Sequence, residues 1–396
     1  MLLINLLIGL VIVGLSRCIT SAPATDLRGA RYAGQQTCVR CHQDIADTYA
    51  GTAHFQTSSA VGNAEGLPEG TGIFRFSDHS RVQVENRQGR LYQVAYSGDR
   101  EVRAGRLDIA FGSGEKARTF AFWEEDALYQ LPLTYYGVVR SWTNSPGFPK
   151  DHPDFGRAIV SRCLECHSSF AEKKIVKTGS LSVLESVVKG SVLYGIDCER
   201  CHGPAARHAE FHADNPGEKK PRYLQNVSSL PRSRKLDMCA VCHSGNDQKT
   251  QRSTFAFLPG DTLANFYYPY GGRSSSEPDV HGNQYQMLAG SACFIKSDMD
   301  CSSCHNTHKT ENNEVLFSQR CLNCHRAGDH APVAPAASIK TNCIDCHMPM
   351  VPSRLITFQQ AGKSRETPYL LRSHRIAVYP DRDGKMQKEM KRSSAR

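Results

Sequence analysis

The sequence is short of the apolar residues that build ordinary protein cores. Hydrophobic residues make up 40% of its 396 positions, a little less than in an average soluble domain. The apolar run from Leu2 to Leu15 is too short to span a membrane comfortably and has the length of a signal-peptide core. No Lys or Arg precedes this run, although signal peptides usually carry one there. The composition therefore differs from that of an ordinary globular protein.

The first 24 residues allow three interpretations, and all of them predict export. Cleavage after the small residues Ala22 and Ala24 would remove residues 1–24 as a signal peptide. Alternatively, Cys18 ends a stretch that resembles a lipoprotein signal, although Arg17 is unusual before a lipidated Cys. The third possibility is an uncleaved anchor. We predict a periplasmic protein, or one attached by lipid at Cys18 to the outer face of a bacterial membrane.

Cysteine is abundant, with 16 residues, and in an exported protein cysteines form disulfides unless another group takes them. The stretch "CERCHGPAARHAEFH" has two interpretations. Cys198, Cys201, His208 and His212 could bind zinc through thiolates and imidazoles. Alternatively, Cys198, Cys201 and His202 spell C-x-x-C-H, the attachment sequence of a c-type haem.

The C-x-x-C-H pattern occurs seven times, and we number the copies motif 1 to motif 7. They are "CVRCH" at Cys38, "CLECH" at Cys163, "CERCH" at Cys198, "CAVCH" at Cys239, "CSSCH" at Cys301, "CLNCH" at Cys321 and "CIDCH" at Cys343. Neither zinc sites nor disulfides need a His directly after the second Cys of every pair. The repetition therefore predicts seven covalently bound haem c groups.

The spacing fits this chemistry. Two Cys three residues apart share one face of a helical turn, so both can form thioethers with one porphyrin, and the following His can bind the iron. The predicted attachment residues are Cys38, Cys41, Cys163, Cys166, Cys198, Cys201, Cys239, Cys242, Cys301, Cys304, Cys321, Cys324, Cys343 and Cys346. The predicted proximal ligands are His42, His167, His202, His243, His305, His325 and His347.

Nine further His residues could supply the second axial ligand, and ligation by two His favours low reduction potentials. Met348 and Met350, which follow motif 7, offer a ligand that would raise the potential. Cys293 lies outside the motifs, and we expect it to be a buried, unreactive thiol.

Several segments resemble the exported multihaem c-type cytochromes, which include tetrahaem carriers of ammonia oxidation, pentahaem nitrite reductases and octahaem hydroxylamine oxidoreductases. The similar segments are "YAGQQTCVRCHQDIADTYAGTAHF", "SPGFPKDHPDFGRAIVSRCLECH", "GIDCERCHGPAARH", "DVHGNQYQMLAGSACFIKSDMDCSSCHNTH", "CHRAGDH" and "RSHRI". The resemblance implies distal iron ligands at His54, His152, His208, His281, His308, His330 and His374. His79 and His212 are the two His residues left over.

The supply of His favours an electron-transfer protein, with no catalytic residue assigned. The C-x-x-C-K motif that nitrite reductases of this superfamily use at their catalytic haem is absent. The alternative is a reductase or oxidoreductase of a small nitrogen or sulfur compound at one five-coordinate haem, either at motif 4 or nearest the β-rich insert described below. A docking scaffold is the third possibility. The expected partners are other cytochromes or a quinol-linked membrane oxidoreductase.

Six motifs fall within residues 163–347, so little protein surrounds each haem and the porphyrins themselves must fill the core. We therefore expect mainly short α-helices and irregular loops packed around seven haems. Residues 70–140 alternate as strands do, which predicts a small antiparallel β-rich insert packed by its aromatic residues. The expected parts are a signal peptide (1–24), a first haem module (25–60), the insert (61–145), a six-haem domain (146–380) and a basic tail (381–396).

The formal net charge of +9 does not indicate nucleic-acid binding. Each ferric haem would add a charge of about −1 through its propionates, so seven haems would lower the total to about +2. Many Lys and Arg side chains would then neutralise propionates.

Overall fold

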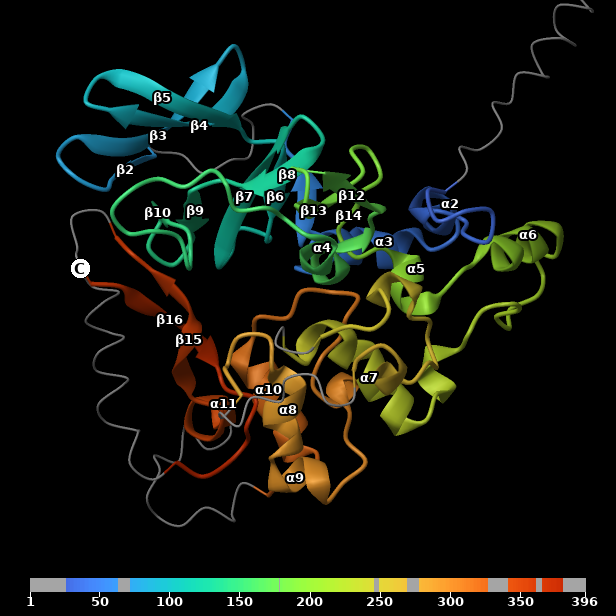
Figure 1. Cartoon of the computed structure of the whole chain (residues 1–396). Helices are drawn as coiled ribbons and strands as arrows, with labels where there is room; N and C mark the ends of the chain where they lie inside the picture. Colours follow the sequence, from blue (N-terminus) through green and yellow to red (C-terminus); the bar gives the residue numbers. More distant parts are fainter. Residues whose placement is uncertain are drawn as a thin grey trace, which may run out of the picture.

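The computed structural model describes residues 26–62, 72–177, 179–245, 249–268, 278–326, 341–360 and 365–379. Strands gather in one part of the molecule and helices in another (Figure 1). The predicted signal peptide, Cys18, His330 and the basic tail lie outside the described residues. Within those residues no helix is long and apolar enough to cross a membrane.

The strands run through the first half of the described chain and return at its end. They are β1 (Ser58–Ala60), β2 (Ile73–Arg75), β3 (Ser80–Arg87), β4 (Arg90–Ser97), β5 (Arg100–Arg106), β6 (Ile109–Phe111), β7 (Ala117–Glu124), β8 (Ala127–Gln130), β9 (Leu133–Tyr136), β10 (Ser141–Asn144), β11 (Ser168–Phe170), β12 (Lys173–Lys177), β13 (Val183–Val187), β14 (Leu193–Tyr194), β15 (Met350–Phe358) and β16 (Thr367–Arg372).

The helices are short, and most of them contain or adjoin a C-x-x-C-H motif. They are α2 (Gln35–Val39), α3 (Gln43–Ala50), α4 (Ser161–His167), α5 (Cys198–His202), α6 (Ala206–Asp214), α7 (Arg232–His243), α8 (Gln284–Ala289), α9 (Ala292–Ile295), α10 (Glu314–Leu322) and α11 (Cys343–His347). Single 3-10 turns occur at η1 (Val227–Ser229), η2 (Thr254–Ala256), η3 (Leu263–Asn265) and η4 (Cys301–Ser303).

Strands β2 to β5 form one antiparallel sheet in chain order. Between β3 and β4 only Gln88 and Gly89 form the loop, since Arg87 pairs with Arg90. Both loop residues have positive φ, 53° and 79°, the pattern of a type I′ turn, whose twist matches that of the strands.

A second sheet has the order β1-β6-β7-β9-β10, with β8 also paired to β7. The two sheets share a core that includes Phe74, Val82, Phe120, Leu131 and Trp142, all of which are buried. Among the aromatic residues of the predicted insert, Tyr129 and Tyr135 pack against this core and Trp123 against a neighbouring one.

The expectation of mainly short helices and irregular loops is wrong. About 26% of the described residues are helical, but about 28% lie in strands of several antiparallel sheets. Three additional hairpin-like pairs, β11–β14, β12–β13 and β15–β16, lie outside residues 61–145. Alternating burial along β12 and the apolar cluster of Tyr136, Phe358 and Tyr369 stabilise strands where loops were expected.

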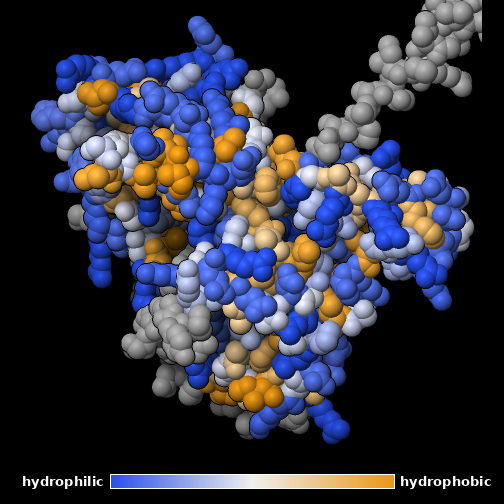
Figure 2. All heavy atoms as spheres, turned by 45° about the vertical axis from the view of Figure 1, so that its right-hand side comes forward, coloured by the Kyte–Doolittle hydropathy of each residue, from blue (hydrophilic) through white to orange (hydrophobic). Residues whose placement is uncertain are grey.

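The core is therefore larger than the composition suggested. Tyr136 of β9 stacks on Phe358 of β15 with ring centroids 4.8 Å apart. This contact joins the C-terminal hairpin to the sheets, although more than two hundred residues separate the two in sequence. Polar side chains cover much of the visible face, and apolar side chains form separate patches at its upper left, through its middle and at its lower end (Figure 2).

Candidate haem-binding site

Each motif folds as one helical turn. In motifs 1, 5 and 6 the amide of the His donates to the carbonyl of the first Cys, at 2.9, 2.9 and 3.0 Å; in motifs 2, 3, 4 and 7 the same residues lie in helices. N-caps start three of these turns, because Asp197, Asp300 and Asn342 accept from amides of motifs 3, 5 and 7. The two Cys and the His of each motif therefore lie on one side of a turn.

Three motif His residues face a His from a distant part of the chain. The ring centroids of His243 and His54 are 6.1 Å apart, with an angle of 86° between the ring planes. Those of His202 and His308 are 5.9 Å apart at 15°. Those of His305 and His374 are 6.2 Å apart at 29°.

These separations fit two axial ligands of one iron. A metal–imidazole bond is about 2.1 Å long, so imidazoles on opposite sides of one metal place their ring centroids about 6 Å apart. All three pairs match this value, whether the two rings are nearly parallel or perpendicular. The residues present therefore fit a haem between the two His of each pair.

Contacts between distant segments position two of the three partner His, His54 and His308. The carbonyl of His54 accepts from the amide of Ile196 at 3.0 Å, and a Cβ on Gly195 would lie 2.1 Å from the carbonyl oxygen of Phe55. Gly195 also has φ +66°, so glycine permits this close approach. Thr310, near His308, donates to the carbonyl of Gly51 at 2.7 Å.

The Nδ1 atoms of several predicted ligands have hydrogen-bond partners. His347 and His208 donate from Nδ1 to the carbonyls of Ala377 at 2.9 Å and Arg222 at 2.8 Å. His167 Nδ1 lies 2.9 Å from Thr57 Oγ1. Because a carbonyl only accepts, the proton of His347 and His208 sits on Nδ1 and Nε2 keeps its lone pair for a metal.

The surroundings of the paired imidazoles lower the pKa of several of them. Burial and the nearby His243 and His305 lower the pKa of His54 to about 4. Burial, with a smaller effect of His305, lowers the pKa of His374 to about 4. Burial likewise lowers the pKa of His202, and the charges of His308, His42 and His208 add to it. A neutral imidazole is the form that binds a metal.

Thiols of different motifs are neighbours. The thiols of Cys38 and Cys198, of Cys166 and Cys242, and of Cys239 and Cys301 are close enough to shift each other's pKa. Burial, and then the charges of Cys343 and Cys304, raise the pKa of Cys321 to about 11. The haem-attachment positions therefore form one contiguous cluster.

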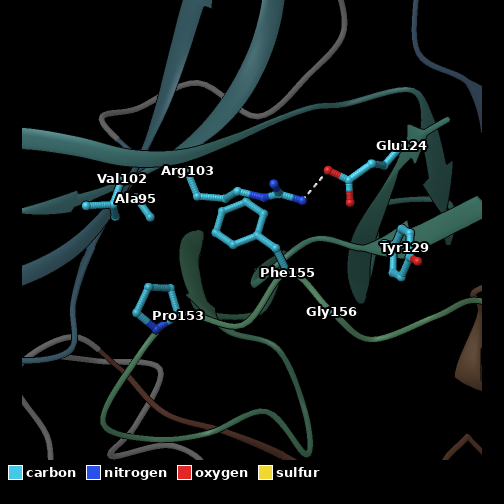
Figure 3. Close-up of a pocket in the computed structure, with 8 residues that line it drawn as sticks. All are labelled: Ala95, Val102, Arg103, Glu124, Tyr129, Pro153, Phe155 and Gly156. Carbon is cyan, nitrogen blue, oxygen red and sulfur yellow. Dashed lines mark hydrogen bonds and ion pairs between the residues drawn. The ribbon is translucent and has the colours of Figure 1, made fainter. Parts of the chain in front are cut away.

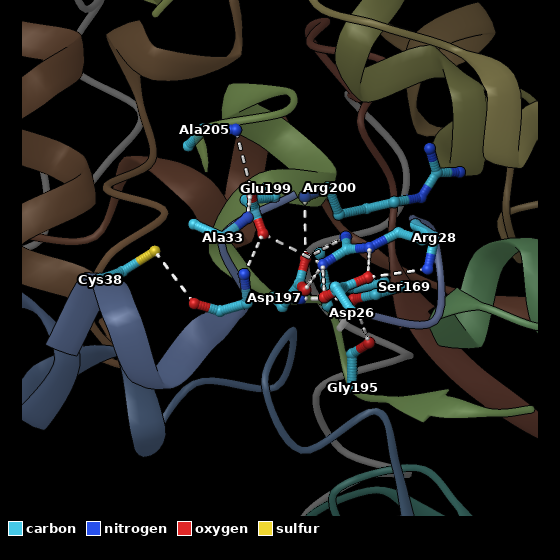
Figure 4. Close-up of polar contacts among 12 residues, drawn as sticks. Asp26, Arg28, Ala33, Cys38, Ser169, Gly195, Asp197, Glu199, Arg200 and Ala205 are labelled. Atoms are coloured by element: carbon cyan, nitrogen blue, oxygen red, sulfur yellow. Dashed lines mark hydrogen bonds and ion pairs between the residues drawn. The ribbon is translucent and has the colours of Figure 1, made fainter. Parts of the chain in front are cut away.

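A buried ionic network, which we call the Arg28 cluster, joins the N-terminal segment to motif 3 (Figure 4). Arg28 contacts Asp26, Asp197 and Glu199 at 2.8, 2.6 and 3.2 Å, and all four side chains are at most 7% exposed. Burial raises the pKa of Asp26, but hydrogen bonds from Arg28 outweigh it and hold this pKa below its usual value. Glu199 also accepts from the amides of Ala33 and Gly34, both at 2.9 Å.

A second buried carboxylate, Glu165, links motif 2 to its surroundings. It accepts from Ser253 Oγ at 2.7 Å and from Thr254 Oγ1 at 3.1 Å, and it pairs with Arg162 at 3.2 Å. The carbonyl of Glu165 also accepts from Arg200 Nη2 of motif 3 at 3.2 Å. Sequence reasoning missed the burial of Glu165 and Glu199, because the two residues between the Cys of a motif carry no pattern of their own.

The remaining predicted ligands are placed less closely. His152 is exposed and bonds Asp151 through Nδ1 at 2.8 Å. Burial lowers the pKa of His167, and a hydrogen bond with Thr57 raises it by less. His281 lies near enough to His167 to lower this pKa a little further. His42 lies near His202, and His325 is exposed. Cys293 is partly exposed rather than buried.

Two other features bear on the alternatives. Within the described residues, no group of three or more His, Cys, Asp or Glu side chains is arranged to hold a metal ion. An open hollow of about 500 Å³ lies on the sheets, where Arg103 and Glu124 form an ion pair beside Phe155 (Figure 3).

Comparisons with known proteins agree with this site. Residues 150–203, which hold motifs 2 and 3, match the family of cytochrome c554 and c-prime. The chain is 23% identical over 197 residues to the multihaem cytochrome MtrA of Shewanella baltica (strain OS185), a match that covers 43% of this chain and 56% of that protein. The chain thus matches little more than half the length of this relative. No solved structure is significantly similar to the chain.

Both matches are with c-type cytochromes, so they confirm the resemblance to the multihaem c-type cytochromes. They also support haem c as the cofactor.

Proposed function

We propose that the chain is an exported heptahaem cytochrome that carries electrons between redox proteins through irons ligated mostly by two His. Haem bound at the motifs would supply the one-electron chemistry of its iron. The observation that carries the proposal is the placement of His54, His308 and His374 about 6 Å, centroid to centroid, from the motif His of three different motifs.

The proposed ligand pairs are His243 with His54, His202 with His308, and His305 with His374. His42 and His208 both lie near His202, which is already paired with His308. This proximity favours His42 and His208 as the ligand pair of motif 1. The charge of His281 at His167 favours that pair at motif 2. His325 and His347 would then take His330 and His152 as partners, in an order that we leave open.

The thiol contacts support a spatial order of the motifs. Motif 1 adjoins motif 3 through Cys38 and Cys198, and motif 4 adjoins motifs 2 and 5 through Cys242 and Cys239. The pKa of Cys239 is raised by Cys301, by burial and, less strongly, by Cys201. The effect of Cys201 indicates that motifs 3 and 4 are neighbours. We propose the order 1, 3, 4, 5, 6, 7, with motif 2 as a branch at motif 4.

This arrangement favours electron transfer over the catalytic alternative at motif 4. An open iron there would need a free face, and the ring of His54, 6.1 Å from that of His243, supports a second ligand instead. The partners remain proposals: other cytochromes or a quinol-linked membrane oxidoreductase. Export, with or without a lipid at Cys18, is also part of the proposal.

The test is low-temperature EPR of the ferric holoprotein, together with its mass under denaturing conditions. Seven haems above the mass of the mature polypeptide and only low-spin signals would support the proposal. A high-spin signal near one haem equivalent would instead mean an open iron and a catalyst. Nitrite, hydroxylamine and sulfur oxyanions would then be tested as substrates.

A further inference from the structure

Helix α6 presents His208 and His212, one turn apart, to the backbone of a single residue, Arg222. His208 donates from Nδ1 to the carbonyl of Arg222 at 2.8 Å. The amide of the same residue donates to Nε2 of His212 at 3.4 Å. The two imidazole centroids are 4.6 Å apart. The backbone of Arg222 is thus bound at its carbonyl by one His and at its amide by the other.

These bonds give the two imidazoles opposite roles. In the neutral imidazole of His208 the proton is on Nδ1, because a carbonyl can only accept, and Nε2 keeps its lone pair. His212 accepts at Nε2, so that atom is engaged by the protein. Of the two, only His208 offers Nε2 to a metal.

Side-chain packing holds the backbone of Arg222 and Tyr223 against α6. The guanidinium of Arg207 lies 3.8 Å from the ring centroid of Tyr223, and the ring of Phe211 lies 5.4 Å from it. Arg222 itself pairs with Glu218 at 3.1 Å. Tyr223 has φ 59°, an unfavourable conformation for a residue with a Cβ, and these contacts offset the strain.

We propose that His212 and Tyr223 are positioning residues for His208. They hold the Arg222 carbonyl in place, and that carbonyl sets the ring orientation and the tautomer with which His208 meets an iron. A partner on the far nitrogen of a ligating His commonly has this effect. The inference rests on the proposed function, in which His208 is a distal ligand.

The test uses the holoprotein with His212→Leu, which removes the acceptor, and His212→Gln, which can restore it. The readouts are the EPR spectrum and the haem count by denaturing mass. We expect His212→Leu to shift one low-spin signal or to convert part of it to high spin, with the haem count unchanged. His212→Gln should return the spectrum to that of the wild type. His79→Leu, a change at an exposed His in the turn between β2 and β3, is the matched control and should alter nothing.

Tyr223→Ala removes the packing that holds the Arg222 carbonyl against α6 and should shift the same signal. The inference is overturned if His212→Leu and Tyr223→Ala both leave the spectrum unchanged while His208→Ala opens one iron. If His208→Ala itself leaves every iron low-spin, the ligand assignment in the proposed function fails, and this inference fails with it.

Discussion

The Arg28 cluster allows a quantitative test of what holds the N-terminal segment to motif 3. Replacing Arg28 by Met would keep much of the side-chain volume and remove the charge. Asp26, Asp197 and Glu199 would then share a buried site without the guanidinium that contacts all three at 2.6–3.2 Å. Removing one partner of a buried ion pair costs about 3–5 kcal/mol, because the remaining charge stays buried and uncompensated.

We expect Arg28→Met to lower the free energy of unfolding by about that amount. The matched control is Arg87→Met, because Arg87 also bonds two carboxylates, Glu85 and Glu101, but its side chain is 35% exposed. Exposed ion pairs contribute about 1 kcal/mol or less. Urea unfolding of each holoprotein, followed by circular dichroism, gives both values from the midpoint and the slope.

The effect of Arg28→Met should depend on pH. Arg28 depresses the pKa of Asp26 in the folded state, so this stabilisation is complete above the unfolded pKa of about 3.9. It is lost as the pH falls through the lower folded value. The difference between Arg28→Met and the wild type should therefore shrink below about pH 4. A loss at pH 7 no larger than that of Arg87→Met would refute the reasoning, since the buried carboxylates would then be compensated by other groups.

Three further changes test the haem sites. His54→Ala should convert one of the low-spin irons to high spin and leave the haem count unchanged, as measured by EPR and denaturing mass; an unchanged spectrum would contradict the pairing with His243. Gly195→Ala should disturb the same iron, because its Cβ would lie 2.1 Å from the carbonyl oxygen next to His54; the expected loss of stability exceeds about 1 kcal/mol, since positive φ adds strain to the clash. Cys201→Ala should remove one thioether at motif 3 and change the haem absorption band after denaturation, whereas Cys293→Ala should not.

The local chemistry could be predicted from the sequence because it depends on five contiguous residues. Each C-x-x-C-H motif needs only one helical turn to bring two Cys and a His to one side, and such a turn forms from nearby residues. The matches with cytochrome c554 and c-prime and with a multihaem cytochrome agree with that interpretation.

The fold class could not be predicted in the same way. Strands such as β15 and β16 are stabilised because Phe358 and Tyr369 pack against Tyr136, which lies more than two hundred residues earlier. A contact of that kind leaves little periodic signal in either segment. The sequence therefore predicted loops where antiparallel pairs occur.

The sequence by itself determined how many haem-attachment motifs the chain has and nominated the His residues that could complete them. Only the tertiary structure decided which of those His face each other. His54 lies near His243 because the amide of Ile196 donates to the carbonyl of His54 and Gly195 packs against the carbonyl of Phe55. The tertiary structure likewise brought the amide of Arg222 within hydrogen-bond distance of His212. Axial pairing depends on distances of a few ångströms between remote segments, and such distances are set by packing rather than by spacing along the chain.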